Sequence, residues 1–227
     1  MIFRQLFDPE SSTYSYLLGD ADRREAVIVD PVRERAARDL ALIAELRLRV
    51  VSILETHVHA DHVTGARALK ARTGAQTVVS LHCGASGFDR LLEDGDVIVF
   101  GDQVVRAIAT PGHTPGSTCY LWHDRLLTGD TLLIGGCGRT DFQFGDAGAL
   151  YDSITLRLFT LPEDTLVYPG HDYRGRCVST IGEEKRTNPR LANVSREQFI
   201  EIMRNLDLPH PTRIAEAVPA NLQGGTL

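Results

Sequence analysis

The residues that follow the apolar run at 50–54 constrain this chain more than any other feature. Four side chains that commonly bind metal ions stand within the six positions from 57 to 62: His57, His59, Asp61 and His62. Imidazoles this close together repel one another when protonated, and a bound metal relieves that repulsion by taking up their lone pairs. The cluster therefore predicts a metal centre at the carboxyl end of a buried strand.

Short apolar strands alternate with amphipathic helices along most of the chain. The pattern predicts strands at 1–7, 12–18, 26–31, 50–54, 76–80, 97–100, 103–109, 117–122, 125–128 and 165–168. It predicts helices at 33–47, at 61–72 with Asp61 as N-cap, and at 148–160, 183–187 and 195–206. Many strands between helices favour a four-layer αββα sandwich, in which two packed sheets carry helices on their outer faces. We expect one domain over residues 1–227, with a short helical and irregular C-terminal segment from about residue 183.

Three more candidate ligands follow later strands. His113, Asp130 and His171 each stand just past a predicted strand, beside glycine or proline residues that let the backbone turn sharply. A lone histidine in such a place is commonly a surface or hydrogen-bonded residue, and Asp130 has an alternative role as a turn cap. With the 57–62 cluster at the same edge of the sheets, we expect all three to reach its pocket. His82, His123 and His210 lack a strand-end setting and are expected to be ordinary residues.

Composition narrows the class of protein. With 43% hydrophobic and 24% charged residues, the chain is typical of globular proteins, and its net charge of -6 favours neither nucleic acid nor an anionic membrane as a partner. The first residues resemble neither a signal peptide nor a transit peptide, and no apolar stretch is long enough to span a bilayer, so a cytoplasmic location is expected. The four cysteines are widely spaced and predict reduced thiols, with Cys137 in a glycine-flanked loop.

These motifs together resemble the metallo-β-lactamase superfamily. Its signature is the HVHADH sequence at 57–62 with the later ligands His113, Asp130 and His171, and all seven family positions are filled. The resemblance runs from about residue 12 to residue 190 and implies the αββα sandwich. The resemblance predicts the fold but not the reaction, because proteins with this fold catalyse many different reactions.

A narrower resemblance covers nearly the whole chain. The sequence is similar to the persulfide dioxygenases (sulfur dioxygenases) at residues 136–143 (GCGRTDFQ), 168–173 (YPGHDY), 178–180 (VST), 187–191 (TNPRL) and 216–221 (EAVPAN). It implies a single Fe(II) held by His57, His113 and Asp130. The groups that would orient these ligands without binding the metal are His59, Asp61, His62, His171 and Asp172.

Two imidazoles and one carboxylate leave three positions open on an octahedral iron, enough for a persulfide sulfur and dioxygen together. The implied reaction is the oxidation of glutathione persulfide by O₂ and water to sulfite and glutathione. Arg139 and Tyr173 are the expected contacts of the tripeptide, Arg139 with a carboxylate and Tyr173 through its hydroxyl group. Alternatives are an ion pair of Arg139 with Asp141 or Asp146, and ordinary packing of Tyr173. A homodimer is one oligomeric state that the resemblance allows.

Seven ligands also suffice for two metals, as in the glyoxalase II hydrolases of glutathione thioesters, and residue types alone do not exclude that alternative. Only about twenty residues follow the predicted helix 195–206, with Arg213 the lone basic one, whereas that family carries a helical C-terminal region with basic residues. A non-catalytic persulfide or glutathione sensor is a further alternative, in which ligands would be expected to be missing.

Overall fold

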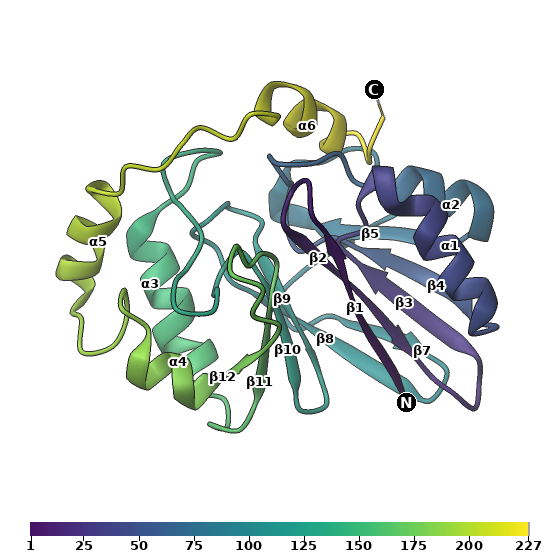
Figure 1. Cartoon of the computed structure of the whole chain (residues 1–227), viewed down its shortest axis with the longest axis horizontal. Coiled ribbons are helices and arrows are strands. Elements are labelled where there is room, and N and C mark those ends of the chain that lie inside the picture. Colours follow the sequence, from purple (N-terminus) through teal and green to yellow (C-terminus); the bar gives the residue numbers. More distant parts are fainter. Residues whose placement is uncertain (227) are drawn as a thin grey trace.

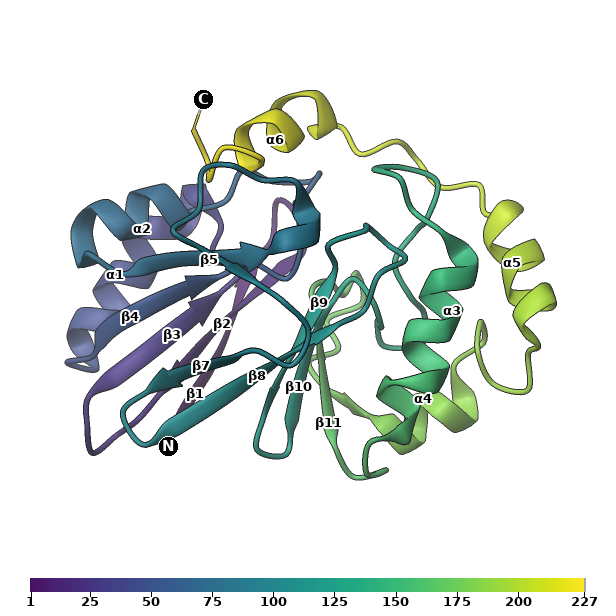
Figure 2. The ribbon, with the colours of Figure 1, turned by 180° about the vertical axis from the view of Figure 1, so that it is seen from behind.

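Two six-stranded sheets pack face to face, and helices cover both outer faces (Figures 1 and 2). This is the architecture of a computed structural model that describes residues 1–226. The arrangement confirms the predicted αββα sandwich. Whether residues 1–227 form a single domain stays a prediction, and residue 227 lies outside the described residues.

The first sheet is built from the N-terminal half of the chain in sequential order, β1-β2-β3-β4-β5-β6. Its strands are β1 (Ile2–Asp8), β2 (Thr13–Gly19), β3 (Glu25–Val29), β4 (Arg49–Leu54), β5 (Gln76–Ser80) and β6 (Arg90–Leu92). Strands β3, β4, β5 and β6 run parallel to one another, whereas β1, β2 and β3 pair antiparallel. Because parallel strands end at the same edge, the loops after β3 and β4 meet there.

The second sheet has the order β12-β11-β10-β9-β8-β7. Its strands are β7 (Val97–Phe100), β8 (Gln103–Ala109), β9 (Thr118–Trp122), β10 (Arg125–Gly129), β11 (Leu166–Pro169) and β12 (Ser179–Thr180). β10 and β11 are parallel, so the loops after them also leave from a common edge.

Three apolar clusters separate the four layers. Tyr16, Trp122 and neighbouring side chains from both sheets fill the centre. Helices α1 (Ala36–Glu45) and α2 (Ala66–Thr73) close the cluster outside the first sheet. Helices α3 (Ala147–Leu156), α4 (Ile181–Thr187) and α5 (Arg196–Arg204) close the cluster outside the second sheet. Helices α1 to α4 therefore bury apolar side chains toward a sheet, and α5 packs on α3, with Phe199 against Tyr151.

The C-terminal part differs from the expected irregular tail. Residues after α5 cross from one helical layer to the other, and α6 (Ile214–Asn221) lies near α2 at the end of the sandwich where the strand loops emerge (Figures 1 and 2). Ala217 and Ala220 of α6 pack on Val63. The helix was missed because its apolar positions are small and Pro219 interrupts the helical pattern.

Two further differences concern element boundaries. The helix expected from residue 61 begins only at Ala66, and Gly65 is its N-cap, so the predicted capping role of Asp61 is wrong. Asp61 instead binds His62, and residues 57–64 form no helix or strand. Strands β6 and β12 were not predicted because they have only three and two residues. In residues 1–226, no helix has the length and apolar character needed to cross a bilayer.

Candidate metal centre

The predicted metal-binding residues converge at the edge where the two sheets present their loops. His57 follows β4, and His113 follows β8. Asp130 and His171 follow the parallel strands β10 and β11. Side chains separated by more than a hundred residues therefore share one pocket because the topology brings four strand ends together.

Three of these residues form a compact donor group. One ligand atom from each of His57, His113 and Asp130 lies within 4.8 Å of the other two. The Nε2 atom of His113 lies 3.7 Å from Oδ2 of Asp130, and the rings of His57 and His113 are nearly perpendicular, at 85°. Atoms at such spacing can share one ion. Two imidazoles and one carboxylate are the set that favours a non-haem Fe(II) with open coordination positions.

Both histidines of this group are oriented through Nδ1. The Nδ1 atom of His113 lies 2.7 Å from the carbonyl oxygen of Arg139, which can only accept a hydrogen bond. The Nδ1 atom of His57 lies 3.0 Å from Oγ1 of Thr56, whose hydroxyl group in turn donates to Asp30. Both rings therefore carry their proton on Nδ1, which leaves the Nε2 lone pair for a metal.

Two glycines make the close approach of these groups possible. A Cβ atom on Gly138 would lie 2.2 Å from the carbonyl oxygen of Asp130 and 2.9 Å from Nδ1 of His113. A Cβ atom on Gly170 would lie 2.7 Å from Oδ1 of Asp130. Any larger residue at either position would displace a member of the donor group, which explains why these motifs contain glycine.

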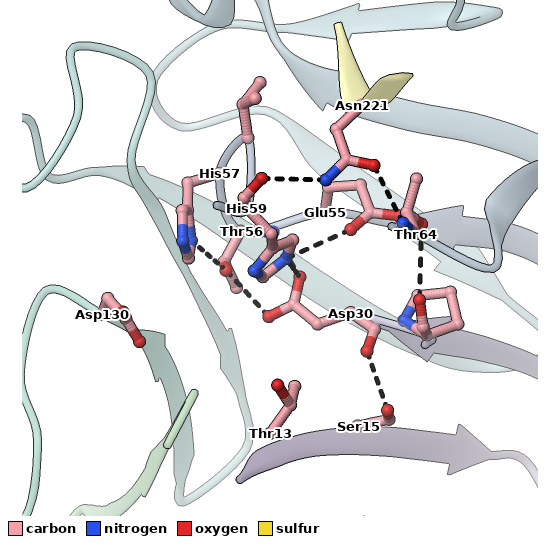
Figure 3. Close-up of polar contacts among 12 residues, drawn as sticks. Thr13, Ser15, Asp30, Glu55, Thr56, His57, His59, Thr64, Asp130 and Asn221 are labelled. Carbon is pink, nitrogen blue, oxygen red and sulfur yellow. Dashed lines mark hydrogen bonds and ion pairs between the residues drawn. The ribbon is translucent and has the colours of Figure 1, made fainter. Parts of the chain in front are cut away.

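His59 lies beside the donor group of His57, His113 and Asp130, with its ring centre 4.1 Å from that of His57. Its Nε2 atom lies 3.1 Å from Oδ1 of Asp30 and 3.3 Å from Oε2 of Glu55, and all three side chains are buried (Figure 3). Asp30 is fixed in turn by the backbone N–H and the hydroxyl group of Thr56. His59 is thus bound to two carboxylates on the side of the first sheet.

Asp61, His62 and His171 line the same pocket but bind other partners. Nδ1 of His62 lies 2.8 Å from Oδ2 of Asp61, which also accepts the hydroxyl group of Thr13. Nε2 of His171 lies 3.6 Å from Asp130 and 3.8 Å from Asp61. Ligand atoms of His59, Asp61 and His62 also lie within 4.8 Å of one another, so a second group of donors exists beside the first.

The pKa values of His57 and His59 are shifted in opposite directions. Burial, together with the neighbouring His59 and His113, holds the pKa of His57 well below its usual value, so its ring is neutral. Burial acts in the same direction on His59, but the carboxylates of Asp30 and Glu55 raise the pKa of His59 well above the usual value. Without a metal, the ring of His57 therefore offers a lone pair, whereas Asp30 and Glu55 favour a proton on the ring of His59.

The expected substrate-binding residues lie at the rim of the pocket. The guanidinium group of Arg139 pairs with both carboxylate oxygens of Asp141 at 2.7 Å and lies over the ring of Phe142. The ion pair with Asp141, the alternative considered for Arg139, is therefore present. The ring of Tyr173 is 77% exposed and parallel to that of His171, with 6.1 Å between the ring centres.

Asp172, expected to orient a ligand, binds its own loop. Its carboxylate accepts the backbone N–H groups of Arg174 and Arg176 and pairs with the Arg176 side chain. It supports the loop that carries His171 and Tyr173 without contacting the donor group itself.

Sequence reasoning missed four buried residues that hold the site: Asp30, Glu55, Thr56 and Asn221. For Asp30 a signal was available, because it ends a predicted strand parallel to the one before His57. Glu55 and Thr56 adjoin the cluster but have no metal-binding pattern. For Asn221 the sequence carried no spatial signal, since it lies 162 residues after His59.

The cysteines are not part of the donor group. Cys137 is buried against Met203, and burial raises the pKa of its thiol. Burial also raises the pKa of Cys119 to about 11 and that of Cys83 to about 12. These three thiols are therefore protonated at neutral pH, which disfavours them as nucleophiles.

The donor group fits a bound metal. Oδ1 of Asp130 is buried and, within residues 1–226, has no hydrogen-bond partner. An unpartnered carboxylate oxygen is costly inside a protein unless a cation binds it. Together with two histidines whose Nε2 atoms are left free, it makes a site that His57, His113 and Asp130 would complete around one ion.

Comparisons with known proteins agree with this geometry. Residues 8–171 match the family model of the metallo-β-lactamase superfamily. The chain is 51% identical to the human protein named persulfide dioxygenase ETHE1, mitochondrial, with 99% of this chain and 89% of that protein covered. The crystal structure of ETHE1 from Myxococcus xanthus is 57% identical and superposes with a TM-score of 0.97, covering 99% of this chain and 100% of that one.

A hydroxyacylglutathione hydrolase from a Polaromonas species is a more distant relative. It is 37% identical, and the match covers 70% of this chain and 62% of the hydrolase. The chain therefore belongs to the metallo-β-lactamase superfamily and, within it, to the family of the persulfide dioxygenase ETHE1.

Proposed function

We propose that this protein is a persulfide dioxygenase that oxidises glutathione persulfide at a single Fe(II) bound by His57, His113 and Asp130. One persulfide, one O₂ and one water give glutathione, sulfite and two protons. The observation that carries the proposal is the donor group of two histidines, each oriented through Nδ1, and one carboxylate in a chain of the ETHE1 family. When bound, Fe(II) brings dioxygen and sulfur together and supplies the one-electron chemistry that dioxygen requires.

The protein's own residues would orient the reactants. The carbonyl oxygen of Arg139 fixes the ring of His113, and the Thr56 hydroxyl group fixes the ring of His57. His171 lies beside the carboxylate of Asp130 and would hold it in place. Such partners of ligands commonly change metal affinity or activity by about 10–100-fold.

The rim would recognise the tripeptide. Arg139 presents a guanidinium group to which a glutathione carboxylate can bind in place of Asp141, whose side chain is largely exposed. Tyr173 presents an exposed phenol next to His171. Phe144 is 94% exposed and stands in the same loop as Arg139, which is unusual for a large apolar side chain and suits contact with a ligand.

The ring of His59 bears on the number of metals. Its Nε2 atom faces Asp30 and Glu55, whereas its Nδ1 atom is buried and, within residues 1–226, has no hydrogen-bond partner, so Nδ1 is the atom that this ring could offer to a second metal. The competing proposal is a dinuclear hydrolase of glutathione thioesters. It is favoured by one observation, the second donor group of His59, Asp61 and His62, and by the distant hydroxyacylglutathione hydrolase.

One experiment separates the two. The protein is purified without oxygen, its iron and zinc are quantified, and O₂ uptake and sulfite release are measured with glutathione persulfide beside hydrolysis of a glutathione thioester. We expect about one iron per chain, with O₂ and sulfite in equal amounts. Two zinc ions per chain, thioester hydrolysis and no O₂ uptake would refute the dioxygenase proposal.

Two finer predictions belong with this proposal. The human relative is named mitochondrial, and a cytoplasmic location of the present chain stays a prediction, which fractionation of the source cells would test. A homodimer also stays a prediction, to be measured by light scattering of the iron-loaded protein.

A further inference from the structure

The carbonyl groups of the segment 57–64 need partners outside that segment. Residues 57–64 form neither helix nor strand, yet His57, His59 and His62 are buried. A buried backbone group without a partner is strongly unfavourable, so each of these carbonyl and N–H groups must be satisfied by another part of the chain. The conformation of the metal-binding segment therefore depends on what binds its backbone.

One side chain from the C-terminal helix satisfies three of these groups. The Nδ2 atom of Asn221 donates to the carbonyl oxygens of His59 at 2.9 Å and His62 at 2.8 Å. Its Oδ1 atom accepts the N–H of Thr64 at 2.8 Å. Figure 3 shows the amide of Asn221 at the end of α6 directed at this segment. Both N–H bonds of the amide are used, which requires asparagine and no other side chain of its size.

A chain of contacts leads from Asn221 to His59, whose ring lies against that of His57. Thr64, whose N–H binds Asn221, donates its hydroxyl group to Glu55. Glu55 lies in turn 3.3 Å from Nε2 of His59. Asn221 is 2% exposed, so these hydrogen bonds are screened from water and hold the segment more rigidly than surface bonds would.

The helix itself is fixed to the first half of the chain. Ala217 and Ala220 pack on Val63, within the metal-binding segment. Arg213 and Glu216 pair with Glu34 and Arg33, which lie in the loop between β3 and α1. The orientation of Asn221 is therefore set by packing on the segment and by ion pairs beside it.

We infer that Asn221 is a positioning residue of the metal centre, through which α6 sets the backbone between His57 and Thr64. This rests on the proposed metal site but not on its reaction. Helix α6 is therefore part of the active site, because segment 57–64 needs the hydrogen bonds of Asn221 to bind a metal tightly.

The test measures metal binding by the full-length apoprotein, with Co(II) as the probe. Asn221→Asp keeps the size of the side chain but turns an oxygen toward the two carbonyl groups. Asn221→Ser is a smaller change that keeps one donor. We expect Asn221→Asp to bind Co(II) about 10–100-fold more weakly, which is the range observed when a partner of a metal ligand is lost. Asn221→Ser should lose less affinity. The visible spectrum of the bound Co(II) should be altered in both variants.

Leu158→Ala is the control for stability alone. Leu158 is fully buried in the cluster around α3 and α5, and it contacts no residue of segment 57–64 in the described chain. We expect it to lower the melting temperature at least as much as the Asn221 variants, with unchanged Co(II) affinity and spectrum. If both Asn221 variants bind Co(II) like the unaltered protein, the inference is wrong. If the unaltered protein itself binds no Co(II), the proposed metal site is wrong instead.

Discussion

The two segments that border the pocket are held in opposite ways. Segment 57–64 is irregular and largely buried, and its polar groups contact the buried side chains of Asp30, Glu55 and Asn221. Loop 139–144 carries the expected substrate contact, and Arg139 in it pairs with Asp141 and donates to the carbonyl oxygens of residues 208 and 209, whereas the ring of Phe144 is exposed.

This difference indicates how the two segments tolerate change. Removing one member of a buried hydrogen-bonded network leaves other groups unsatisfied and costs about 1–3 kcal/mol or more. An exposed ion pair contributes about 0–1 kcal/mol. Metal binding should therefore be sensitive to substitutions in the buried segment and its partners, whereas substrate preference should change with substitutions in the loop at little cost in stability.

The largest effect should follow loss of the carboxylate ligand. Asp130→Ala removes the anionic donor, and we expect it to abolish iron retention and to lower kcat/KM by at least about 100-fold, beyond what loss of a ligand's partner causes. Iron per chain and O₂ uptake are the measurements. Asp141→Ala, a carboxylate on the surface loop, is the control and should keep its iron; equal iron loss in both variants would contradict the contrast between the segments.

Asp30→Asn should weaken metal binding, but less than the loss of Asp130 does. The carboxylate of Asp30 accepts two hydrogen bonds from Thr56 and lies 3.1 Å from Nε2 of His59, and a neutral amide cannot take over all of these contacts. We expect about 10–100-fold weaker metal binding, measured by competition with a chelator. Asp20→Asn is the matched control, because Asp20 is also buried and accepts backbone N–H groups, but far from the pocket. Unchanged metal affinity in Asp30→Asn would contradict the proposed role of the buried network.

Substitution of the arginine in the loop should change substrate binding only. Because the carbonyl oxygen of Arg139, not its side chain, orients His113, Arg139→Ala should leave iron content unchanged. We expect KM for glutathione persulfide to rise about tenfold, since a hydrogen bond to a charged group contributes about 1.5–3 kcal/mol. Steady-state O₂ uptake measures it, and Asp141→Asn, which removes the negative charge paired with the guanidinium group, should not raise KM. An unaltered KM in Arg139→Ala would exclude this side chain from substrate recognition.

The smallest effect concerns stability in acid. The backbone N–H groups of Arg23 and Asp102 lower the pKa of Asp20 to about 2, below the value of about 3.9 in an unfolded chain. Its contribution is complete above the unfolded value and is lost as the pH falls through the folded one. The melting temperatures of the unaltered protein and Asp20→Asn should therefore converge between about pH 4 and pH 2. A constant difference across that range would show that the charge of Asp20 does not stabilise the fold.

Much of the fold followed from periodicity, because buried strands such as β5, β7 and β8 are continuous in sequence. Their bounds are those expected from the pattern. The predictions that were wrong concern segments whose conformation depends on contacts with distant parts of the chain. Residues 61–65 look helical but are bound by Asn221 and Arg33, and these bonds are stronger than the local helical preference.

The same distinction applies to the site. The donor residues were predictable because each is a metal-binding type at a strand end. The roles of Asn221, Glu55 and Thr56 were not predictable, because they depend on hydrogen bonds that residue type alone does not indicate. The ion pair of Arg139 with Asp141 was foreseen only as one of two alternatives, because opposite charges two positions apart in a loop can pair with each other or with a ligand.

The separation of Asn221 from His57 along the chain has a consequence for biosynthesis. His57 and its neighbours are synthesised more than 160 residues before the side chain that binds their backbone. A nascent chain that stalls before α6 would carry every donor without the amide that shapes their loop, so tight metal binding should begin only after α6 has been synthesised.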